Sequence, residues 1–324
     1  MLQNTFIHIP GIGPKTERML WRRGILTWQA FLDLGGPIFP PSRDAWVRKE
    51  LSASIRHSQD PAYFSGRLPA SEMWRLFEAF KARSVYLDIE TSGGWQGVDE
   101  ITVIGIYDGR EVQTFVNGIN LDEFETAIAS YDLVVSFNGA CFDLPFIRSR
   151  FPGISLPRAH IDLRFILKRM GYAGGLKKIE KDLGLERMPG IQGLDGWEAV
   201  RLWQAHEQGD PTALKTLIAY NTADIVNLKP LMEMAYEHLR ASLMRESRIT
   251  SIIRGITANL VPGQKNFSSA PGLRAGLLSD LSAGDTCPLR ILDFVELRLP
   301  PLISHKETAP SRQSRQKNPS ASIY

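Results

Sequence analysis

Two acidic residues, Asp88 and Glu90, stand at the end of an apolar run, Val85-Tyr86-Leu87. Such a run indicates a strand that is covered on both faces. Because side chains alternate across a strand, the two carboxylates leave the same face. Neighbouring carboxylates in a buried setting repel each other and lose solvation, and a divalent cation between them would remove both costs. The alternative is a strand end that has reached solvent, where the pair is only a polar edge.

A third acid, Asp143, follows a second apolar run at residues 133–137. It falls in or just after the loop at the carboxyl end of that expected strand. Open sheets with parallel strands bind ligands outside the carboxyl ends of the strands. We therefore expect Asp143 to face the end of the strand that carries Asp88 and Glu90. The alternative is an acid at a helix N-terminus, which the helix dipole favours.

A fourth acid, Asp224, lies four residues after Tyr220 in a segment with apolar residues at helical spacing. Residues four apart lie on one face of a helix. An aspartate beside the apolar stripe of a helix is costly to bury unless it meets a partner. The alternative is a solvated aspartate at the edge of the stripe.

The pattern around these acids predicts the elements that position them. Strands are expected at 84–90, 101–107, 111–116, 133–137 and 159–162. Helices are expected at 71–82, 121–129, 163–170, 176–183, 197–208 and 212–238. Asp108-Gly109 between two apolar runs predicts a hairpin, and Pro230 is expected to kink the last helix. A strand, a hairpin, a helix and a returning strand imply an α/β fold with a mixed sheet, in which the returning strand runs parallel to the first.

The four acids and the tyrosine, in this order, resemble the DEDDy 3′–5′ exonucleases of the ribonuclease H-like superfamily. The residues that carry the resemblance are Asp88-x-Glu90, Asp143 and Tyr220-x-x-x-Asp224. Within this family, the residues around the four acids are most similar to those of the bacterial YprB-type domain. The similar stretches are residues 87–91, 160–163, 176–180, 183–185 and 220–228. The resemblance covers residues 82–240 and implies a ribonuclease H-like mixed central sheet flanked by helices.

The same resemblance implies a site with two Mg²⁺ or Mn²⁺ ions, since an all-carboxylate site suits hard cations. The ligands would be Asp88, Glu90, Asp143 and Asp224. Two such ions stabilise the attacking and leaving oxygens of a displacement at phosphorus. Tyr220 would then orient the attacking water.

Several further residues are candidates for contacts with nucleic acid. The resemblance gives this role to Thr91 and Asn138. Lys177 and Lys178 belong to a positive cluster near the presumed cleft, which could follow a phosphate backbone. The alternative for these lysines is a solvated helix face.

Residues 6–34 are expected to form a small helical unit around a turn that contains Gly11 and Gly13, followed by Lys15. The hydrophobic-Gly-hydrophobic-Gly turn resembles the helix-hairpin-helix motif. In that family the turn exposes backbone amides to a phosphate without sequence preference. Thr27 is expected to cap a second helix. The alternative is an ordinary helical hairpin that uses glycines for its geometry.

The composition of the chain excludes several classes of protein. The chain has 324 residues, 43% of them hydrophobic, and its net charge of +3 does not by itself indicate nucleic acid. Its two cysteines give neither a disulfide framework nor zinc spacing. No run approaches the ~18 apolar residues of a membrane span, and the first residues lack a secretion signal. We expect a cytoplasmic protein without a disulfide partner or membrane association.

These inferences divide the chain into four parts. They are a helix-hairpin-helix-like unit with a connector at 1–64, a ribonuclease H-like domain at 65–240, an extension at 241–302 and a disordered basic tail at 303–324. The extension is expected to hold a helix at 240–254 and a strand at 289–299.

The expected function is a metal-dependent nuclease, a 3′–5′ exonuclease acting on phosphodiester bonds of single-stranded DNA or RNA ends. A catalytically silent nucleic-acid-binding module and a structure-specific endonuclease remain alternatives. All of this requires Asp224 to face Asp88 in one pocket that no lysine fills.

Overall fold

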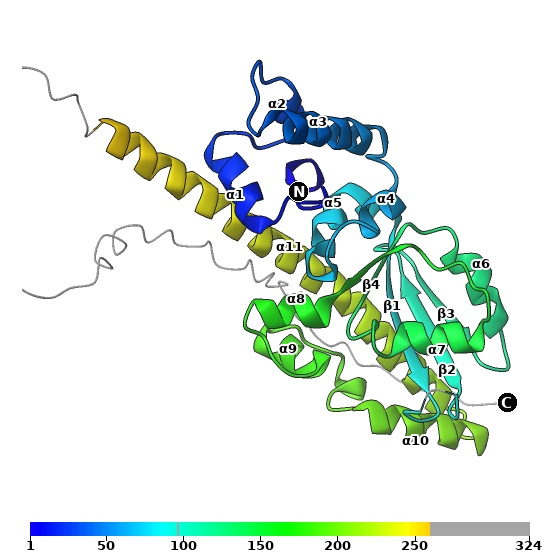
Figure 1. Cartoon of the computed structure of the whole chain (residues 1–324). Coiled ribbons are helices and arrows are strands. Elements are labelled where there is room, and N and C mark those ends of the chain that lie inside the picture. Colours follow the sequence, from blue (N-terminus) through cyan, green and yellow to red (C-terminus); the bar gives the residue numbers. More distant parts are fainter. Residues whose placement is uncertain (96, 260–324) are drawn as a thin grey trace, which may run out of the picture. The chain divides into compact units, whose positions relative to one another are not determined.

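A mixed five-stranded sheet with the order β3-β2-β1-β4-β5 lies at the centre of the computed structural model, which describes residues 1–95 and 97–259 (Figure 1). The strands are β1 (Ser84–Thr91), β2 (Ile101–Tyr107), β3 (Val112–Val116), β4 (Leu133–Ser136) and β5 (Ala159–Asp162). β1 pairs antiparallel with β2 and parallel with β4. The returning strand is therefore parallel to the first, as predicted, and the arrangement is the ribonuclease H-like α/β fold.

Helices cover both faces of this sheet (Figure 1). On one face, α6 (Phe124–Ile128) and α7 (Asp143–Arg150) pack against a cluster that includes Val85, Leu87 and Ile89. The long helix α11 (Ala213–Asn259) covers the other face, where Tyr86 is buried. Because side chains alternate along β1, Asp88 and Glu90 share the α11 face with Tyr86.

The helices that follow the sheet lie close to their predicted positions. They are α8 (Leu163–Arg169), α9 (Leu176–Asp182) and α10 (Gly196–Glu207). The short helix η5 (Pro189–Ile191), between α9 and α10, has no counterpart among the predicted helices. Asp162 caps α8 and Asp195 caps α10 through backbone amides. α11 contains Pro230 and runs beyond the predicted end at 238, so the helix expected at 240–254 is part of it. The strand expected at 289–299 and the tail at 303–324 lie outside the described residues.

The helix predicted for 71–82 is wrong in type. The structure has η2 (Ala70–Leu76), α5 (Phe77–Phe80) and η3 (Lys81–Arg83) in its place. Five consecutive residues, 73–77, are buried, so this part of the segment has no exposed helical face, and exposed residues return only from 78 onward. Glu72 and Arg75 form an ion pair of 2.8 Å at i,i+3, the spacing at which side chains of a 3₁₀-helix stack.

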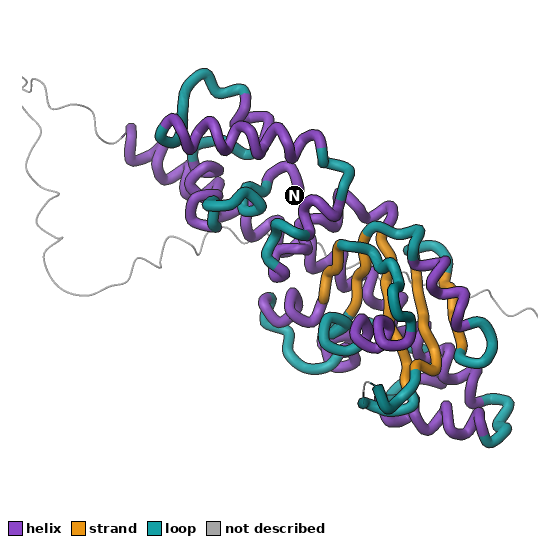
Figure 2. Tube along the Cα trace, turned by 45° about the vertical axis from the view of Figure 1, so that its right-hand side comes forward, coloured by secondary structure: helices purple, strands orange, loops and turns teal. Residues whose placement is uncertain are grey.

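The first helices pack together beside the part of α11 that extends past the sheet (Figure 2). They are η1 (Leu2–Asn4), α1 (Pro14–Arg22), α2 (Trp28–Leu32), α3 (Pro41–Arg56) and α4 (Pro61–Ser65). Thr27 caps α2, as predicted, by accepting from the amide of Ala30. The buried guanidinium of Arg75 pairs with Glu17 of α1 at 2.9 Å. All described residues fall within one compact unit, and the division at residue 64 stays a prediction.

The loop between β3 and α6 carries η4 (Leu121–Glu123). None of the described helices is long and apolar enough to cross a membrane.

Candidate metal-binding site

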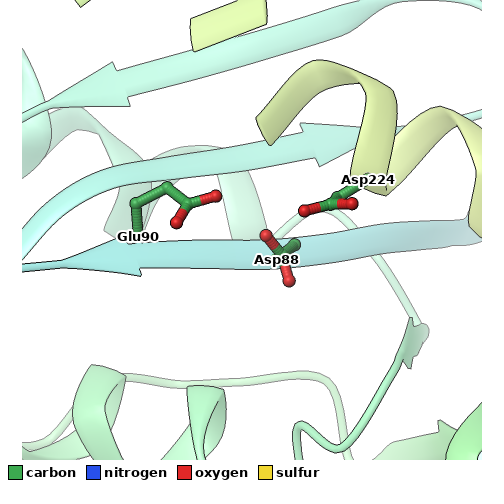
Figure 3. A group of neighbouring side chains, drawn as sticks. All are labelled: Asp88, Glu90 and Asp224. Atoms are coloured by element: carbon green, nitrogen blue, oxygen red, sulfur yellow. The ribbon is translucent and has the colours of Figure 1, made fainter. Parts of the chain in front are cut away.

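Three carboxylates, those of Asp88, Glu90 and Asp224, meet between β1 and α11 (Figure 3). Each side chain offers one oxygen, and these oxygens lie within 4.8 Å of one another. Glu90 and Asp224 are buried and Asp88 is partly buried. The structure thus brings Asp224 to the same side of the sheet as Asp88, as the sequence predicted. Carboxylates held this close and this far from water are a candidate site for a divalent cation.

Asp143 is the first residue of α7 and lines the same cavity as the three acids. Its Oδ1 accepts the backbone N–H of Ile89 at 3.1 Å. That amide is available because β4 pairs with β1 only as far as Tyr86. Asp143 therefore faces the end of β1, as predicted, but its carboxylate is bound to the strand backbone and lies outside the three-acid group.

Asn221 fixes the carboxylate of Asp88. Its fully buried amide donates to Asp88 Oδ2 at 3.0 Å and to Asp88 O at 3.3 Å. Gly105 pairs with Asp88 across β1 and β2, and a Cβ at Gly105 would lie 1.9 Å from Asn221 Oδ1. The missing side chain on β2 thus makes room for the amide that holds Asp88.

Two basic side chains engage Asp224. Lys177 Nζ lies 2.9 Å from Asp224 Oδ2, and Arg187 donates to Asp224 Oδ1. Arg187 also forms two hydrogen bonds of 2.7 Å to the buried Glu180. The requirement that no lysine fills the pocket is therefore met only in part. An open cavity of about 460 Å³ remains, but both oxygens of Asp224 already have a cationic partner.

Tyr220 lies one turn before Asp224 on α11 and is 1% exposed. Its ring lines the cavity, with Lys177 Nζ 4.3 Å from the ring centroid. Burial, followed by the charge of Asp224, raises the pKa of the Tyr220 phenol above its usual value. The phenol is therefore protonated at neutral pH and can donate a hydrogen bond.

The acids themselves carry the electrostatic cost of being close together. Burial, followed by the charge of Asp224, raises the pKa of Asp88 well above its usual value and the pKa of Glu90 to about 8. Burial raises the pKa of Asp143 to about 7. Perturbed carboxylates that line one cavity are typical of functional sites.

The other residues predicted to bind nucleic acid divide into two groups. Thr91, Asn138 and Lys177 line the cavity. Asn138 adopts a left-handed φ of 67° and accepts a hydrogen bond from Arg164 through its Oδ1. Lys178 is not among the described residues that line this cavity. It pairs with Asp182 at 2.6 Å on the exposed side of α9.

The glycine turn and its lysine also lie outside the lining of this cavity. Gly11, Gly13 and Lys15 are exposed, and Arg43 donates to the carbonyl of Gly11 at 2.9 Å.

Sequence reasoning missed several residues that shape the site. Asn221 and Glu180 lie in the stretches 220–228 and 176–180, which resemble the YprB-type domain. The sequence pattern nevertheless assigns their side chains no role. Gly105 is one glycine in an apolar strand, a signal for a close approach of another group. Arg187 lies in a loop without periodicity, and nothing in the sequence singles it out.

Residues 85–236 match the model of a protein family, RNase_H_2, which is described as "RNase_H superfamily". With the sheet order, this match identifies these residues as a ribonuclease H-like superfamily domain. No curated protein matches the chain.

Solved structures of nucleic-acid enzymes are similar at low identity. The family B DNA polymerase from the archaeon Pyrobaculum calidifontis is 15% identical with a TM-score of 0.41, over 52% of this chain and 27% of the polymerase chain. Brucella melitensis NrnC with bound Mg²⁺ is 16% identical with a TM-score of 0.35, over 60% of this chain and 94% of that one. Escherichia coli RNase D is 17% identical with a TM-score of 0.36, over 56% of this chain and 48% of the RNase D chain. These likenesses assign no function to this chain.

Proposed function

We propose that this chain is a metal-dependent nuclease, a DEDDy-type 3′–5′ exonuclease that hydrolyses phosphodiester bonds at single-stranded DNA or RNA ends. The observation that carries the proposal is the group of three carboxylates, Asp88, Glu90 and Asp224, with oxygens within 4.8 Å of one another. The family match over residues 85–236 supports it.

The residues present fit a hard divalent cation, because the group contains carboxylates and neither histidine nor cysteine. We infer that Asp88, Glu90 and Asp224, with Asp143 beside them, hold two Mg²⁺ or Mn²⁺ ions. When bound, such ions supply positive charge to the attacking and leaving oxygens of an in-line displacement at phosphorus. Burial, and after it the repulsion of neighbouring carboxylates, raises the pKa values of Glu90 and Asp143, and a bound cation would relieve both effects.

The side chains around the acids have roles that follow from their contacts. The protonated phenol of Tyr220 would orient the attacking water and would not remove its proton. Asn221 would keep the Asp88 carboxylate in place through the 3.0 Å hydrogen bond. Thr91, Asn138 and Lys177 line the cavity and would contact the bound strand.

The N-terminal turn is proposed as a second, sequence-independent contact to nucleic acid. Gly13 precedes α1, which begins at Pro14, so the first amides of α1 lack partners within the helix. Free amides at a helix start favour an anion. Gly11 has a φ of 82°, which suits glycine, and the exposed Lys15 adds positive charge. Lys178 would add positive charge outside the cavity.

A specific observation favours a second candidate, the catalytically silent nucleic-acid-binding module. Lys177 and Arg187 both engage Asp224, and a pair of basic side chains can neutralise an acid that would otherwise bind a cation. In that case the site would need no metal, and nucleic acid would bind without being hydrolysed.

The two candidates are separated by incubating the protein with 3′- and 5′-labelled single-stranded DNA and RNA in Mn²⁺. The exonuclease shortens strands from the 3′ end, and Asp88→Ala and Asp224→Asn abolish this activity. Asp182→Asn, which changes an exposed acid of α9, serves as the matched control and retains it. Binding without hydrolysis and without a Mn²⁺-induced thermal shift would support the silent module. Cutting of a circular single strand would indicate the endonuclease.

A further inference from the structure

A second cavity, of about 580 Å³, lies on the other face of the sheet, beside the edge strand β5. Its charged and titratable lining consists of Arg148 of α7, Arg158 from the loop before β5, and His160. None of the residues that line this cavity is a carboxylate. The cavity is therefore positive, in contrast to the acidic cavity on the α11 face.

The two arginines of this cavity are not neutralised by the protein. Within residues 1–95 and 97–259, neither Arg148 nor Arg158 forms an ion pair or a side-chain hydrogen bond. Other arginines nearby do have partners, since Arg150 pairs with Asp122 at 2.9 Å and Arg164 donates to Asn138. Two free guanidinium groups at one concave surface favour an anion, and their planar donors match phosphate oxygens.

The wall of the cavity is well fixed. His160 Nε2 and Ser136 Oγ lie 2.8 Å apart, so the imidazole is held against β4. The carboxylate of Asp162 accepts the backbone amides of Asn138 at 2.8 Å and Ala140 at 3.1 Å. These bonds hold the loop between β4 and α7 in one conformation.

That loop separates the two cavities. Asn138, Phe142 and Asp143 line the acidic cavity, whereas Ala140 and Leu144 line the basic one. A strand whose end lies at Asp88 would reach the basic cavity by crossing this loop. The basic cavity thus offers an anion-binding position on one side of the loop, and the carboxylates on the other side would bind a phosphate only through a cation.

We propose that the cavity of Arg148 and Arg158 binds a backbone phosphate of the nucleic-acid strand whose end occupies the acidic cavity. The proposal rests on the proposed function for its choice of a nucleic-acid strand as the ligand. A free phosphate or a mononucleotide offers the same chemistry, and the experiment separates these sources. Affinity then depends on strand length, because only a strand long enough to cross the loop reaches both cavities.

Binding is measured by fluorescence anisotropy in Ca²⁺, a hard cation that carboxylates bind, and gel electrophoresis checks that the strands stay intact. The wild type is compared with Arg148→Ala/Arg158→Ala for a labelled dinucleotide and for a single strand of about twelve nucleotides. Inorganic phosphate and a mononucleotide are added to both proteins as competitors. We expect the double variant to lose about tenfold in affinity for the long strand and nothing for the dinucleotide. The slope of log K against log salt should become shallower by about 0.7, the value for one phosphate of a single strand.

Two further variants serve as controls. Arg150→Ala removes a paired arginine from the same helix and should bind both strands as the wild type does. Arg148→Lys/Arg158→Lys keeps the charge, and we expect it to retain the salt slope. Equal melting temperatures of all variants would exclude a folding defect.

Three results would overturn the proposal. They are equal affinity of the wild type and the double alanine variant for the long strand, an equal loss for both strand lengths, and an effect confined to inorganic phosphate or a mononucleotide. Failure of the proposed function looks different. In that case the wild type does not hydrolyse nucleic acid in Mn²⁺, while the length-dependent loss in the double variant persists.

Discussion

Lys177 Nζ lies 2.9 Å from Asp224 Oδ2, inside the cavity that the four acids line. Burial lowers the pKa of this lysine, but the charge and hydrogen-bonding effects of Asp224 and Tyr220 together outweigh burial and raise the pKa above its usual value. The ammonium group is therefore charged at neutral pH. It occupies one oxygen that a cation would need, so the lysine and the cation compete for Asp224.

This competition predicts that Lys177→Met binds Mn²⁺ more tightly than the wild type. Removal of the ammonium frees Asp224 Oδ2 and makes the site more negative by one charge. We expect a dissociation constant about tenfold lower, which corresponds to about 1.4 kcal/mol, as measured by isothermal titration calorimetry. Lys178→Met is the matched control, because Lys178 pairs with Asp182 outside the cavity, and it should leave the constant unchanged. Weaker binding by Lys177→Met would contradict the competition and show that the lysine positions the Asp224 carboxylate for the ion.

The buried contacts of Arg187 predict that its replacement will strongly lower the stability of the protein. Its side chain is 7% exposed and pairs with Glu180 and Asp224, which are 2% and 3% exposed. Removal of one member of a buried ion-pair network leaves uncompensated charge and costs about 3–5 kcal/mol. We expect Arg187→Met to lower the free energy of unfolding by this amount in urea denaturation.

The control for Arg187 is Arg201→Met, which removes an exposed partner of Glu198. Exposed pairs contribute little, so no measurable change in stability is expected. A loss for Arg187→Met no greater than that of the control would contradict the buried network.

The strands could be predicted because their patterns are local. The apolar run before Asp88 and the turn at Asp108-Gly109 depend on neighbouring residues, and the structure confirms both the pairing and the parallel return of β4. The spacing of Tyr220 and Asp224 likewise fixed their common face, because one helix carries both.

The contacts between elements could not be predicted in this way. No local pattern distinguishes Lys177 from Lys178, and only the orientation of α9 decides that one faces Asp224 and the other faces solvent. The partnership of Arg187 with Asp224 joins a loop to α11 across 37 residues. No periodicity in the sequence describes such a contact.

The close approach of Asn221 to Gly105 predicts that a side chain at position 105 will destabilise the protein. A Cβ at this position would lie 1.9 Å from Asn221 Oδ1, so Gly105→Ala should displace the amide that holds Asp88. Overpacking of this kind costs about 1–3 kcal/mol, measured as a loss in the free energy of unfolding. In Gly105→Ala/Asn221→Ala the clash is gone, so the combined loss should be smaller than the sum of the two single losses.

The control for Gly105 is Gly36→Ala, because a Cβ at Gly36 meets nothing within 4 Å. This variant should be as stable as the wild type or nearly so. Exact additivity of the Gly105 and Asn221 substitutions would show that the two positions are not in contact.

The raised pKa values predict that Mg²⁺ stabilises the protein more at high pH than at low pH. In the ion-free fold, Glu90 has a pKa of about 8 and Asp143 of about 7, above their ordinary values of 4.5 and 3.8. The folded state therefore keeps protons that the unfolded chain has released, and stability falls as the pH rises from about 4 to about 8. Cation binding requires the deprotonated carboxylates and becomes stronger over the same interval.

Thermal melting with and without Mg²⁺ at about pH 6 and about pH 8.5 checks this prediction. The melting temperature of the ion-free protein should be lower at the higher pH, and the increase caused by Mg²⁺ should be larger there. Glu90→Gln removes the group with the pKa of about 8, so the ion-free protein should lose less stability between the two values. An Mg²⁺-induced increase of equal size at both pH values would contradict the view that protons and the cation compete for these carboxylates.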